Sequence, residues 1–249
     1  MSDLGAMNVC TPSRLIMVVW TCIWFAGCRE SVDGPGDDAQ ILNQENLTYL
    51  ALGDSYTIGE SVDESGRWPN QLVDSLNLRD LGPDSRLDRA TIVATTGWTT
   101  ANLLAGIESS QVDTATWDLV SLLIGVNNQY QGRSVEEYAA EFSTLLDRCL
   151  ALAGGRDDRV FVVSIPDYGF TPFGATNQTE ISAQLASFND TCRAITWARG
   201  LAYYNITPIS QQWPQWEGLV APDGLHPSAY QYSLWVSTMV DEVAASLQP

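Results

Sequence analysis

TYLALGDSY, residues 48–56, is the stretch that decides the fold of this chain. Residues 48–52 are apolar or β-branched, which is typical of a buried strand. Gly53 ends that run, so Ser55 lies at the turn from a strand into a loop or helix. A turn of this kind exposes the serine hydroxyl and directs backbone N–H groups at an incoming anion. Taken alone, Gly-Asp-Ser after a strand is also an ordinary turn.

Strands and helices are predicted to alternate along the rest of the chain. Four further runs have the length and composition of strands, over residues 90–94, 119–124, 160–165 and 201–206. Helical spacing of apolar residues is clearest after Ser134, which fits an N-cap, and it recurs over 180–199 and 227–247. This alternation favours an α/β fold with a mainly parallel sheet of about five strands and helices on both faces.

Size, charge and composition narrow the class of protein. The chain has 249 residues, 45% of them hydrophobic, and no internal repeat, so residues 46–249 are expected to form one domain. A net charge of -18 opposes binding to nucleic acid or to anionic lipid headgroups. Because His226 is the only histidine, a multi-histidine metal site is excluded. No metal and no other cofactor is expected, and the oligomeric state is not predicted.

The N-terminal segment reads as an export signal. Residues 15–26 form an apolar run after Arg14, long enough for a secretory signal and too short to span a bilayer. The sequence Phe-Ala-Gly before Cys28 resembles the lipobox of bacterial lipoproteins. That resemblance implies a signal peptide over 1–27, lipidation of Cys28 and a lipid-anchored protein of the bacterial cell envelope, periplasmic or on the outer surface. An ordinary signal peptide or an uncleaved anchor is the alternative.

Export leads to two further expectations, one for the segment after the lipobox and one for the two later cysteines. Residues 28–45 are rich in Gly, Asp and Ser and are predicted to be a flexible tether. An oxidising compartment allows Cys149 and Cys192 to form a disulfide, since both fall on the apolar stripes of predicted helices that run parallel. Two buried free thiols are the alternative.

The second and third predicted strands are followed by groups suited to stabilising negative charge. Gly97 lies in Thr-Gly-Trp-Thr after the second strand, where a backbone N–H can donate to an oxyanion. Asn127 lies in Gly-Val-Asn-Asn after the third strand, and its amide is a donor that does not titrate. Ligands of open parallel sheets bind at the carboxyl ends of the strands. Each motif alone also fits an ordinary turn.

Asp-Gly-Leu-His-Pro, residues 223–227, precedes the last predicted helix. A tight turn here can place the carboxylate of Asp223 on the Nδ1–H of His226, which leaves Nε2 available as a base. Pro227 fits the first turn of the helix. The alternative is a helix-capping aspartate beside a surface histidine.

In this order, Gly-Asp-Ser, a mid-chain glycine, Gly-x-Asn and Asp-x-x-His resemble the four blocks of the SGNH subgroup of GDSL hydrolases over nearly the whole predicted domain. The resemblance implies a flavodoxin-like three-layer α/β/α sandwich and ester hydrolysis through a serine nucleophile, without a metal. By position it implies Ser55 as nucleophile and first oxyanion donor and Gly97 and Asn127 as further donors. It also implies His226 as general base and Asp223 as the acid that orients it.

Two residues depart from the family pattern. Tyr56 stands in place of the leucine that gives the broader family its name. Asn128 stands where the family usually has aspartate, beside the predicted oxyanion asparagine. The second departure bears on the hydrogen bonds that hold Asn127, whereas the serine itself is unaffected.

Aromatic residues mark the loops after the fourth and fifth predicted strands. The predicted substrate-binding residues are Tyr168, Phe170, Phe173, Trp213 and Trp216. These side chains are expected to wall an acyl pocket or to stack on sugar rings, or else to anchor their loops. The function expected first is an esterase for short-chain or lysophospholipid-type esters. The alternatives are an O-acetyl deacetylase of polysaccharide and a lipid-anchored binding module with a vestigial triad.

Overall fold

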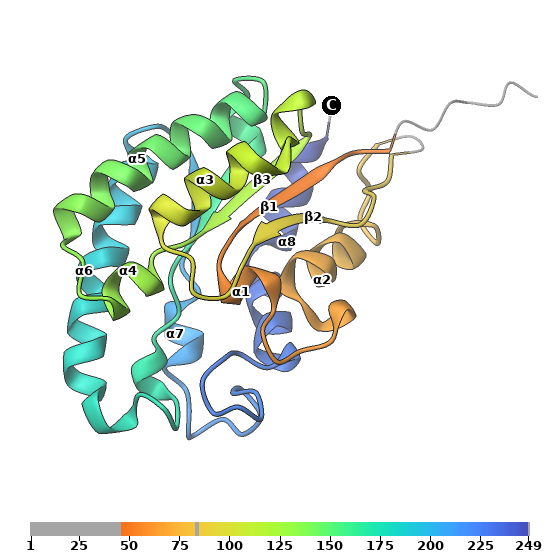
Figure 1. Cartoon of the computed structure of the whole chain (residues 1–249). Helices are drawn as coiled ribbons and strands as arrows, with labels where there is room; N and C mark the ends of the chain where they lie inside the picture. The colour runs from red at the N-terminus through yellow and green to blue at the C-terminus, as the bar shows by residue number, and fades with distance from the viewer. Residues whose placement is uncertain (1–45, 83–84, 249) are drawn as a thin grey trace, which may run out of the picture. The chain divides into compact units, whose positions relative to one another are not determined.

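Residues 48–56 lie at the centre of the fold, because β1 (Tyr49–Gly53) is buried along its whole length. The structure is a computed structural model that describes residues 46–82 and 85–248 (Figure 1). The described residues belong to a compact unit that spans Asn43–Pro249. The predicted signal peptide, the predicted lipidation site Cys28 and the predicted tether lie outside the described residues.

The five predicted strands form one parallel sheet. The other strands are β2 (Thr91–Ala94), β3 (Leu119–Leu123), β4 (Val160–Val163) and β5 (Ala202–Tyr204). Their order in the sheet is β2-β1-β3-β4-β5, with every neighbouring pair parallel. Figure 1 shows β1 between β2 and β3. The chain therefore leaves β1 toward one side of the sheet and returns to the other, which makes a topological switch point at β1.

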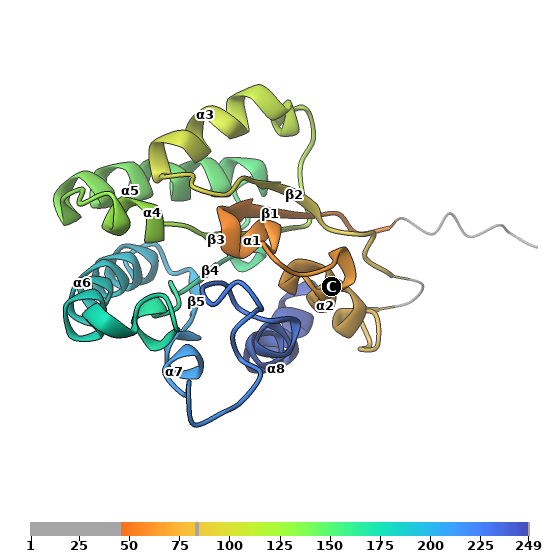
Figure 2. The ribbon, with the colours of Figure 1, turned by 60° about the horizontal axis from the view of Figure 1, so that its bottom comes forward.

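Helices cover both faces of the sheet, as the alternating pattern predicts. Helices α2 (Trp68–Leu76) and α8 (Ala229–Leu247) pack together on one face. The other face carries α3 (Thr100–Ser110), α5 (Val135–Leu152) and α6 (Gln178–Trp197), and Figure 2 shows α3 and α5 opposite α2 and α8. This three-layer α/β/α sandwich confirms the predicted fold class. Within residues 46–82 and 85–248, no helix combines the length and apolar character needed to cross a membrane.

Short helices follow three of the strands at the carboxyl edge of the sheet. They are α1 (Ser55–Ile58) after β1, α4 (Val126–Tyr130) after β3 and α7 (Thr207–Ser210) after β5. Single 3-10 turns complete the connections: η1 (Glu64–Gly66), η2 (Val112–Thr114), η3 (Asp157–Arg159), η4 (Tyr168–Phe170) and η5 (Ala175–Asn177). Ser55 and Asn127 lie in two of these short helices, whereas Gly97, Asp223 and His226 lie in irregular loops between elements.

Side-chain caps set where the long helices begin. Ser134 caps α5 as predicted, because its Oγ accepts a hydrogen bond from the Glu137 N–H at 3.1 Å. Helix α8 begins later than expected, at Ala229, with Ser228 as its N-cap. Pro227 therefore lies before the helix, where it pairs with Val220 in an isolated antiparallel bridge. The bridge closes the loop that carries Asp223 and His226.

The predicted disulfide between Cys149 and Cys192 is wrong, because both residues are buried free thiols. Helices α5 and α6 do pack together, but in a different register from the one expected. Tyr138, in the first turn of α5, packs on Phe188 with ring centroids 4.8 Å apart and contacts the Cys192 thiol. Cys149 lies about three turns further along α5, roughly 16 Å at 1.5 Å per residue, which no disulfide bridges. Burial raises the pKa of both thiols to about 12, so neither is reactive.

Candidate active site

The strand order places three of the predicted site residues next to one another. Ser55 follows β1, Gly97 follows β2 and Asn127 follows β3, and these three strands are adjacent. A cavity of about 270 Å³ opens at this carboxyl edge. Its lining consists of Ser55, Tyr56, Thr96, Gly97, Val126, Asn127, Tyr130, Tyr168, Phe173, Leu225 and His226. The structure thus gathers the predicted nucleophile, the predicted base and all three predicted oxyanion donors around one hollow.

The turn at Ser55 depends on its two neighbours. Gly53 has no room for a side chain, because an added Cβ would lie 2.2 Å from Thr57 Oγ1 and 2.5 Å from the Leu123 carbonyl. Asp54 caps α1 by accepting a hydrogen bond from the Tyr56 N–H at 3.0 Å. Ser55 is therefore the first residue of a helix, and in the described structure its own N–H donates to no protein group. Such an N–H is available to an oxyanion at the cavity wall.

Asp54 is fully buried behind the serine. Burial raises the pKa of its carboxyl to about 7, against the lowering effect of the N–H groups of Tyr56 and Gly125. Its Oδ2 has no hydrogen-bond partner in the described structure. This aspartate is therefore a structural cap whose charge is disfavoured, and it does not line the cavity.

The two further oxyanion donors are held by a bond between their loops. Gly97 has a φ of +87°, in the left-handed region that favours glycine, and within the described residues its N–H donates to no protein group. The Asn127 amide donates to the Trp98 carbonyl at 2.9 Å, which ties the loop after β3 to the loop after β2. Because an amide nitrogen carries two hydrogens, one N–H of Asn127 remains for a ligand.

The departure at Asn128 turns out to be part of the same scaffold. This side chain is fully buried and makes two hydrogen bonds to Thr100 at the start of α3. Its Oδ1 accepts from the Thr100 N–H at 3.0 Å, and its Nδ2 donates to the Thr100 hydroxyl at 2.6 Å. The Thr100 hydroxyl in turn donates to Glu141. Asparagine suits position 128 because the Thr100 hydroxyl has already donated its hydrogen to Glu141 and can only accept from the asparagine amide.

Asp223 and His226 form the pair that the sequence predicts. The Nδ1 of His226 lies 2.7 Å from Asp223 Oδ2, and because a carboxylate only accepts, Nδ1 carries the proton and Nε2 is left as the base. Partial burial would raise the pKa of Asp223, but hydrogen bonds from Ser61, the Leu225 N–H and His226 outweigh it and hold that pKa well below its usual value. The carboxylate therefore stays charged throughout the neutral range.

The imidazole of His226 enters the cavity beside the serine. Its ring meets the ring of Tyr56 edge-on, with centroids 5.9 Å apart, so the tyrosine that replaces the family's leucine packs against the base. Ser55 and His226 line the same cavity, although no hydrogen bond joins them in the described structure. Hydrogen bonds of this kind are often long without substrate and tighten in the complex.

Only part of the predicted aromatic wall is present. Tyr168 and Phe173 line the cavity, whereas Phe170, Trp213 and Trp216 do not. Phe170 ends the turn η4 and points in a different direction from Tyr168. Residues after α7 form a series of turns held by backbone bonds such as Trp216 N–H to the Gln212 carbonyl at 2.9 Å, and neither tryptophan of this loop reaches the cavity lining.

One aromatic residue that lines the cavity, Tyr130, was not predicted from the sequence. Tyr130 in α4 forms a triangle with Tyr168 and Phe173, each pair of ring centroids 6.3 Å apart. We call these three residues the aromatic triangle. Tyr130 and Phe173 are 61% and 51% exposed, so the triangle opens to solvent. The signal in the sequence was the four-residue spacing of Val126 and Tyr130, which puts both on one face of α4.

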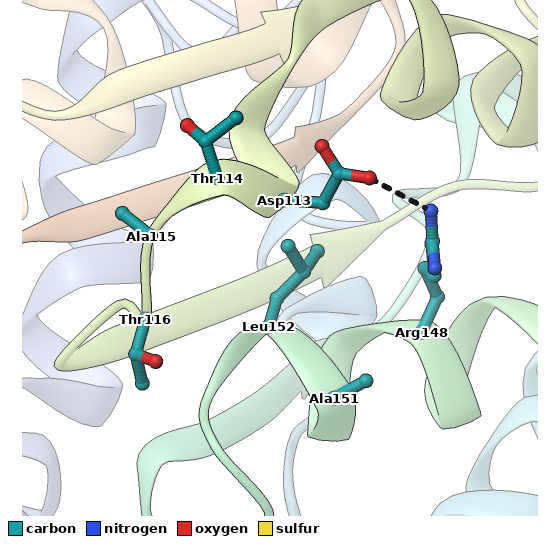
Figure 3. A pocket seen from close by; sticks show the side chains of 7 residues that line it. All are labelled: Asp113, Thr114, Ala115, Thr116, Arg148, Ala151 and Leu152. Atoms are coloured by element: carbon teal, nitrogen blue, oxygen red, sulfur yellow. Dashed lines mark hydrogen bonds and ion pairs between the residues drawn. The ribbon is translucent and has the colours of Figure 1, made fainter.

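A second hollow, of about 410 Å³, lies near the start of β3 and the end of α5 (Figure 3). Its lining is Asp113, Thr114, Ala115, Thr116, Arg148, Ala151 and Leu152, with Arg148 paired to Asp113 at 3.4 Å. It contains no nucleophile beside a base, so its larger volume does not make it the site. No group of three or more metal-ligating side chains occurs among the residues that the structure describes.

The fold and the site together define a class, a three-layer α/β protein with its candidate reactive groups on the loops at the carboxyl edge of a parallel sheet. Within that class the chain belongs to the GDSL-like lipase/acylhydrolase family, whose model matches residues 51–234. It is accordingly a carboxylic ester hydrolase, as the resemblance implies. No curated protein matches the chain significantly.

Solved structures share the fold at low sequence identity. TesA has 18% identity and a TM-score of 0.62, over 80% of this chain and 99% of its own. Axe2, an acetylxylan esterase from Geobacillus stearothermophilus, has 17% identity and a TM-score of 0.60, over 79% of this chain and 94% of its own. A lipase/acylhydrolase from Enterococcus faecalis has 19% identity and a TM-score of 0.57, over 80% and 96%.

Proposed function

We propose that this protein is a serine esterase for short-chain carboxylic esters, with Ser55 as nucleophile, His226 as base and Asp223 as the residue that orients it. The observation that carries the proposal is the cavity shared by Ser55, Gly97, Asn127 and His226, with Asp223 bonded to the imidazole at 2.7 Å. A serine hydroxyl is a poor nucleophile at neutral pH, so nucleophilic attack by Ser55 requires a base in the same cavity.

The proposed reaction proceeds through an acyl-enzyme. Ser55 Oγ forms a bond to the ester carbonyl carbon while its proton passes to Nε2 of His226. The carbonyl oxygen becomes an oxyanion that accepts from the N–H groups of Ser55 and Gly97 and from the Asn127 amide. The imidazolium then protonates the leaving alcohol as the C–O bond breaks, and water repeats the two steps to release the acid. Asp223 remains ionised and stabilises the imidazolium.

The shape of the cavity supports small substrates. About 270 Å³ accommodates a short acyl chain, and the aromatic triangle supplies apolar surface at its rim. A lysophospholipid-type ester would have to extend its longer chain over that exposed rim. The cavity volume therefore supports a preference for short acyl chains, whereas it does not indicate the identity of the alcohol.

O-acetylated polysaccharide is the second candidate substrate. The exposed rings of Tyr130 and Phe173 at the mouth of the cavity offer faces on which a sugar ring can stack. The acetyl group would then reach Ser55 while the glycan stays in solvent. That one structural neighbour is an acetylxylan esterase is consistent with this alternative.

The decisive experiment is labelling with a fluorophosphonate probe, followed by turnover of chromogenic esters of increasing acyl length. We expect the wild type to label and Ser55→Ala to lose both labelling and turnover while keeping its thermal stability. A wild type that fails to label would favour the alternative of a binding module with a vestigial triad. Acetylated xylan or another acetylated glycan that outcompetes the aryl esters would establish the deacetylase instead.

We also propose that the protein is exported and anchored through Cys28. The support is the apolar run over residues 15–26 and the small residues before Cys28. Expression in a bacterium fed with a labelled fatty acid tests it. Label in the wild type and none in Cys28→Ser is the expected result; label in neither would refute the anchor and leave the esterase proposal intact.

A further inference from the structure

The loop that follows the serine helix contacts both neighbouring parts of the site. We call residues 59–62 the brace loop. Its Gly59 caps α1 with a φ of +71°, and Ser61 has a φ of +66°. Glu60 accepts a hydrogen bond from the Thr96 hydroxyl at 2.5 Å, in the loop of the oxyanion glycine. Ser61 donates to Asp223 Oδ2 at 2.6 Å, in the turn of the histidine.

Asp223 receives four hydrogen bonds, and three of them come from its own turn. Its Oδ1 accepts from the N–H groups of Leu225 and His226 at 2.9 and 3.0 Å. Its Oδ2 accepts from His226 Nδ1 at 2.7 Å and from Ser61 Oγ at 2.6 Å. In the described structure Ser61 is thus the one partner of this carboxylate from another part of the chain. The Ser61 hydroxyl and the His226 imidazole both donate to the same oxygen, Asp223 Oδ2.

We propose that Ser61 is a positioning residue of the acid–base pair: its hydroxyl orients the Asp223 carboxylate toward His226 and withdraws charge from the oxygen that the imidazole uses. This inference rests on the proposed function. A carboxylate that already accepts a strong hydrogen bond stabilises the imidazolium less. The hydroxyl therefore moderates how strongly Asp223 stabilises the imidazolium, while it holds the carboxylate in the position that Nδ1 of His226 uses.

The backbone of Ser61 supports a role for its side chain. A positive φ is uncommon for residues other than glycine, and among such residues in the described structure only Ser61 and Gln111 adopt one. Ser61 occupies the left-handed region although glycine would relieve the strain. Strained conformations of this kind cluster at functional sites, and here the strained residue places its hydroxyl on the orienting acid.

Other titratable groups surround the pair and must be separated from the effect of Ser61. They are Tyr56 on α1, which meets the His226 ring, Tyr168 on η4, which lines the same cavity, Tyr232 on α8, Glu60 on the brace loop, and Asp54 and Asp167, which act on Tyr56. Burial raises the pKa of Tyr56 and of Tyr232 well above its ordinary value, so neither ionises near neutral pH. Asp54, with its pKa raised to about 7, titrates in the same range as imidazole. None of these groups is altered in the Ser61 variants, so a difference from wild type isolates the hydroxyl.

The test compares Ser61→Ala with Ser61→Gly in the full chain. Both remove the hydroxyl, but only glycine relieves the strained φ. Because His226 is the only histidine, its titration can be followed by NMR without assignment, alongside the pH profile of kcat/KM. We expect both variants to move the titration midpoint upward by about half a pH unit and to lower kcat by roughly threefold to tenfold. Ser65→Ala, at an exposed serine of η1, is the matched control and should leave both unchanged.

Unchanged midpoints in both variants would overturn the proposal. So would a midpoint that moves in only one of them, because the effect would then belong to the backbone and not to the hydroxyl. If Ser55→Ala retained activity, the proposed function would fail, yet the NMR titration would still report whether Ser61 acts on the Asp223–His226 pair. The two failures are therefore distinguishable.

Discussion

The two halves of the site are built in different ways. Ser55 and the scaffold of Asn127 lie at the ends of central strands, where Asp54 and Asn128 are fully buried. Asp223 and His226 lie in a loop closed by a single bridge, with side chains 30% and 12% exposed. The serine side depends on the core of the protein, whereas the histidine side depends on a few hydrogen bonds at the surface. Substitutions should therefore affect stability on one side and activity alone on the other.

His226→Ala should have the largest effect on activity and almost none on stability. Loss of the base leaves Ser55 with its proton, so we expect kcat/KM to fall by at least about 10³-fold. The imidazole contributes little to the core, so the thermal midpoint should stay within a few degrees of wild type. Ester kinetics and a thermal melt on the same sample check both halves of the prediction. A large loss of stability would show that the histidine turn supports the fold after all.

Asn127→Ala should lower kcat by about 10²-fold to 10³-fold, with a smaller effect on KM, because the oxyanion exists only after attack. The same change removes the bond to the Trp98 carbonyl at 2.9 Å. We therefore expect a modest loss of stability beside the loss of rate, in contrast to His226→Ala. A raised KM with an unchanged kcat for a series of esters would argue that the amide already binds the ground state instead.

Asp54→Asn should change how stability depends on pH. The pKa of Asp54 in the folded state is raised to about 7, above its value in the unfolded chain, so the folded state binds the proton more tightly. The stability that this provides is present below about pH 4 and is lost as pH rises through 7, by up to roughly 4 kcal/mol. Asparagine keeps the acceptor for the Tyr56 N–H and does not titrate. Denaturant unfolding from pH 4 to 8 should show a flatter profile for the variant; parallel profiles would contradict the assignment.

Asn128→Asp should have the smallest of these effects, although it restores the family's usual residue. The Thr100 hydroxyl already donates to Glu141, so an aspartate would face it with two acceptors and a buried charge. We expect a loss of about 1–3 kcal/mol at neutral pH, partly recovered in acid where the new carboxyl is protonated. Equilibrium unfolding at both pH values measures it. The double variant with Glu141→Gln serves as the control and should lose less.

The site residues that could be predicted were those that belong to short sequence motifs. Ser55, Gly97 and Asn127 each follow a strand directly, so the order of strands alone brings them together at one edge. The pair of Asp223 and His226 is local, three residues apart in one turn, and its bond could be expected from that spacing. The fold class followed from the alternation of elements for the same reason, because burial on both faces leaves apolar strands between helical segments.

Contacts between distant segments were the part that the sequence did not reveal. The cysteines of α5 and α6 fit the apolar stripes but differ in height by three turns, which depends on how two helices slide past each other. The aromatic loop at 210–218 was expected to wall the cavity, but it forms turns whose tryptophans do not line it. Tyr130 and Ser61 were not singled out, because neither stands in a recognisable motif.

By itself, then, the sequence determined the order of the elements and the family, and it supplied the candidate reactive groups, since periodicity, capping and short motifs act over a few residues. Only the tertiary structure decided which aromatic rings face the cavity, that both thiols stay unpaired and that Ser61 reaches Asp223 across 162 positions in the chain. Those outcomes depend on side-chain packing between elements, where shifts of a single helical turn change every partner and leave the local pattern unchanged.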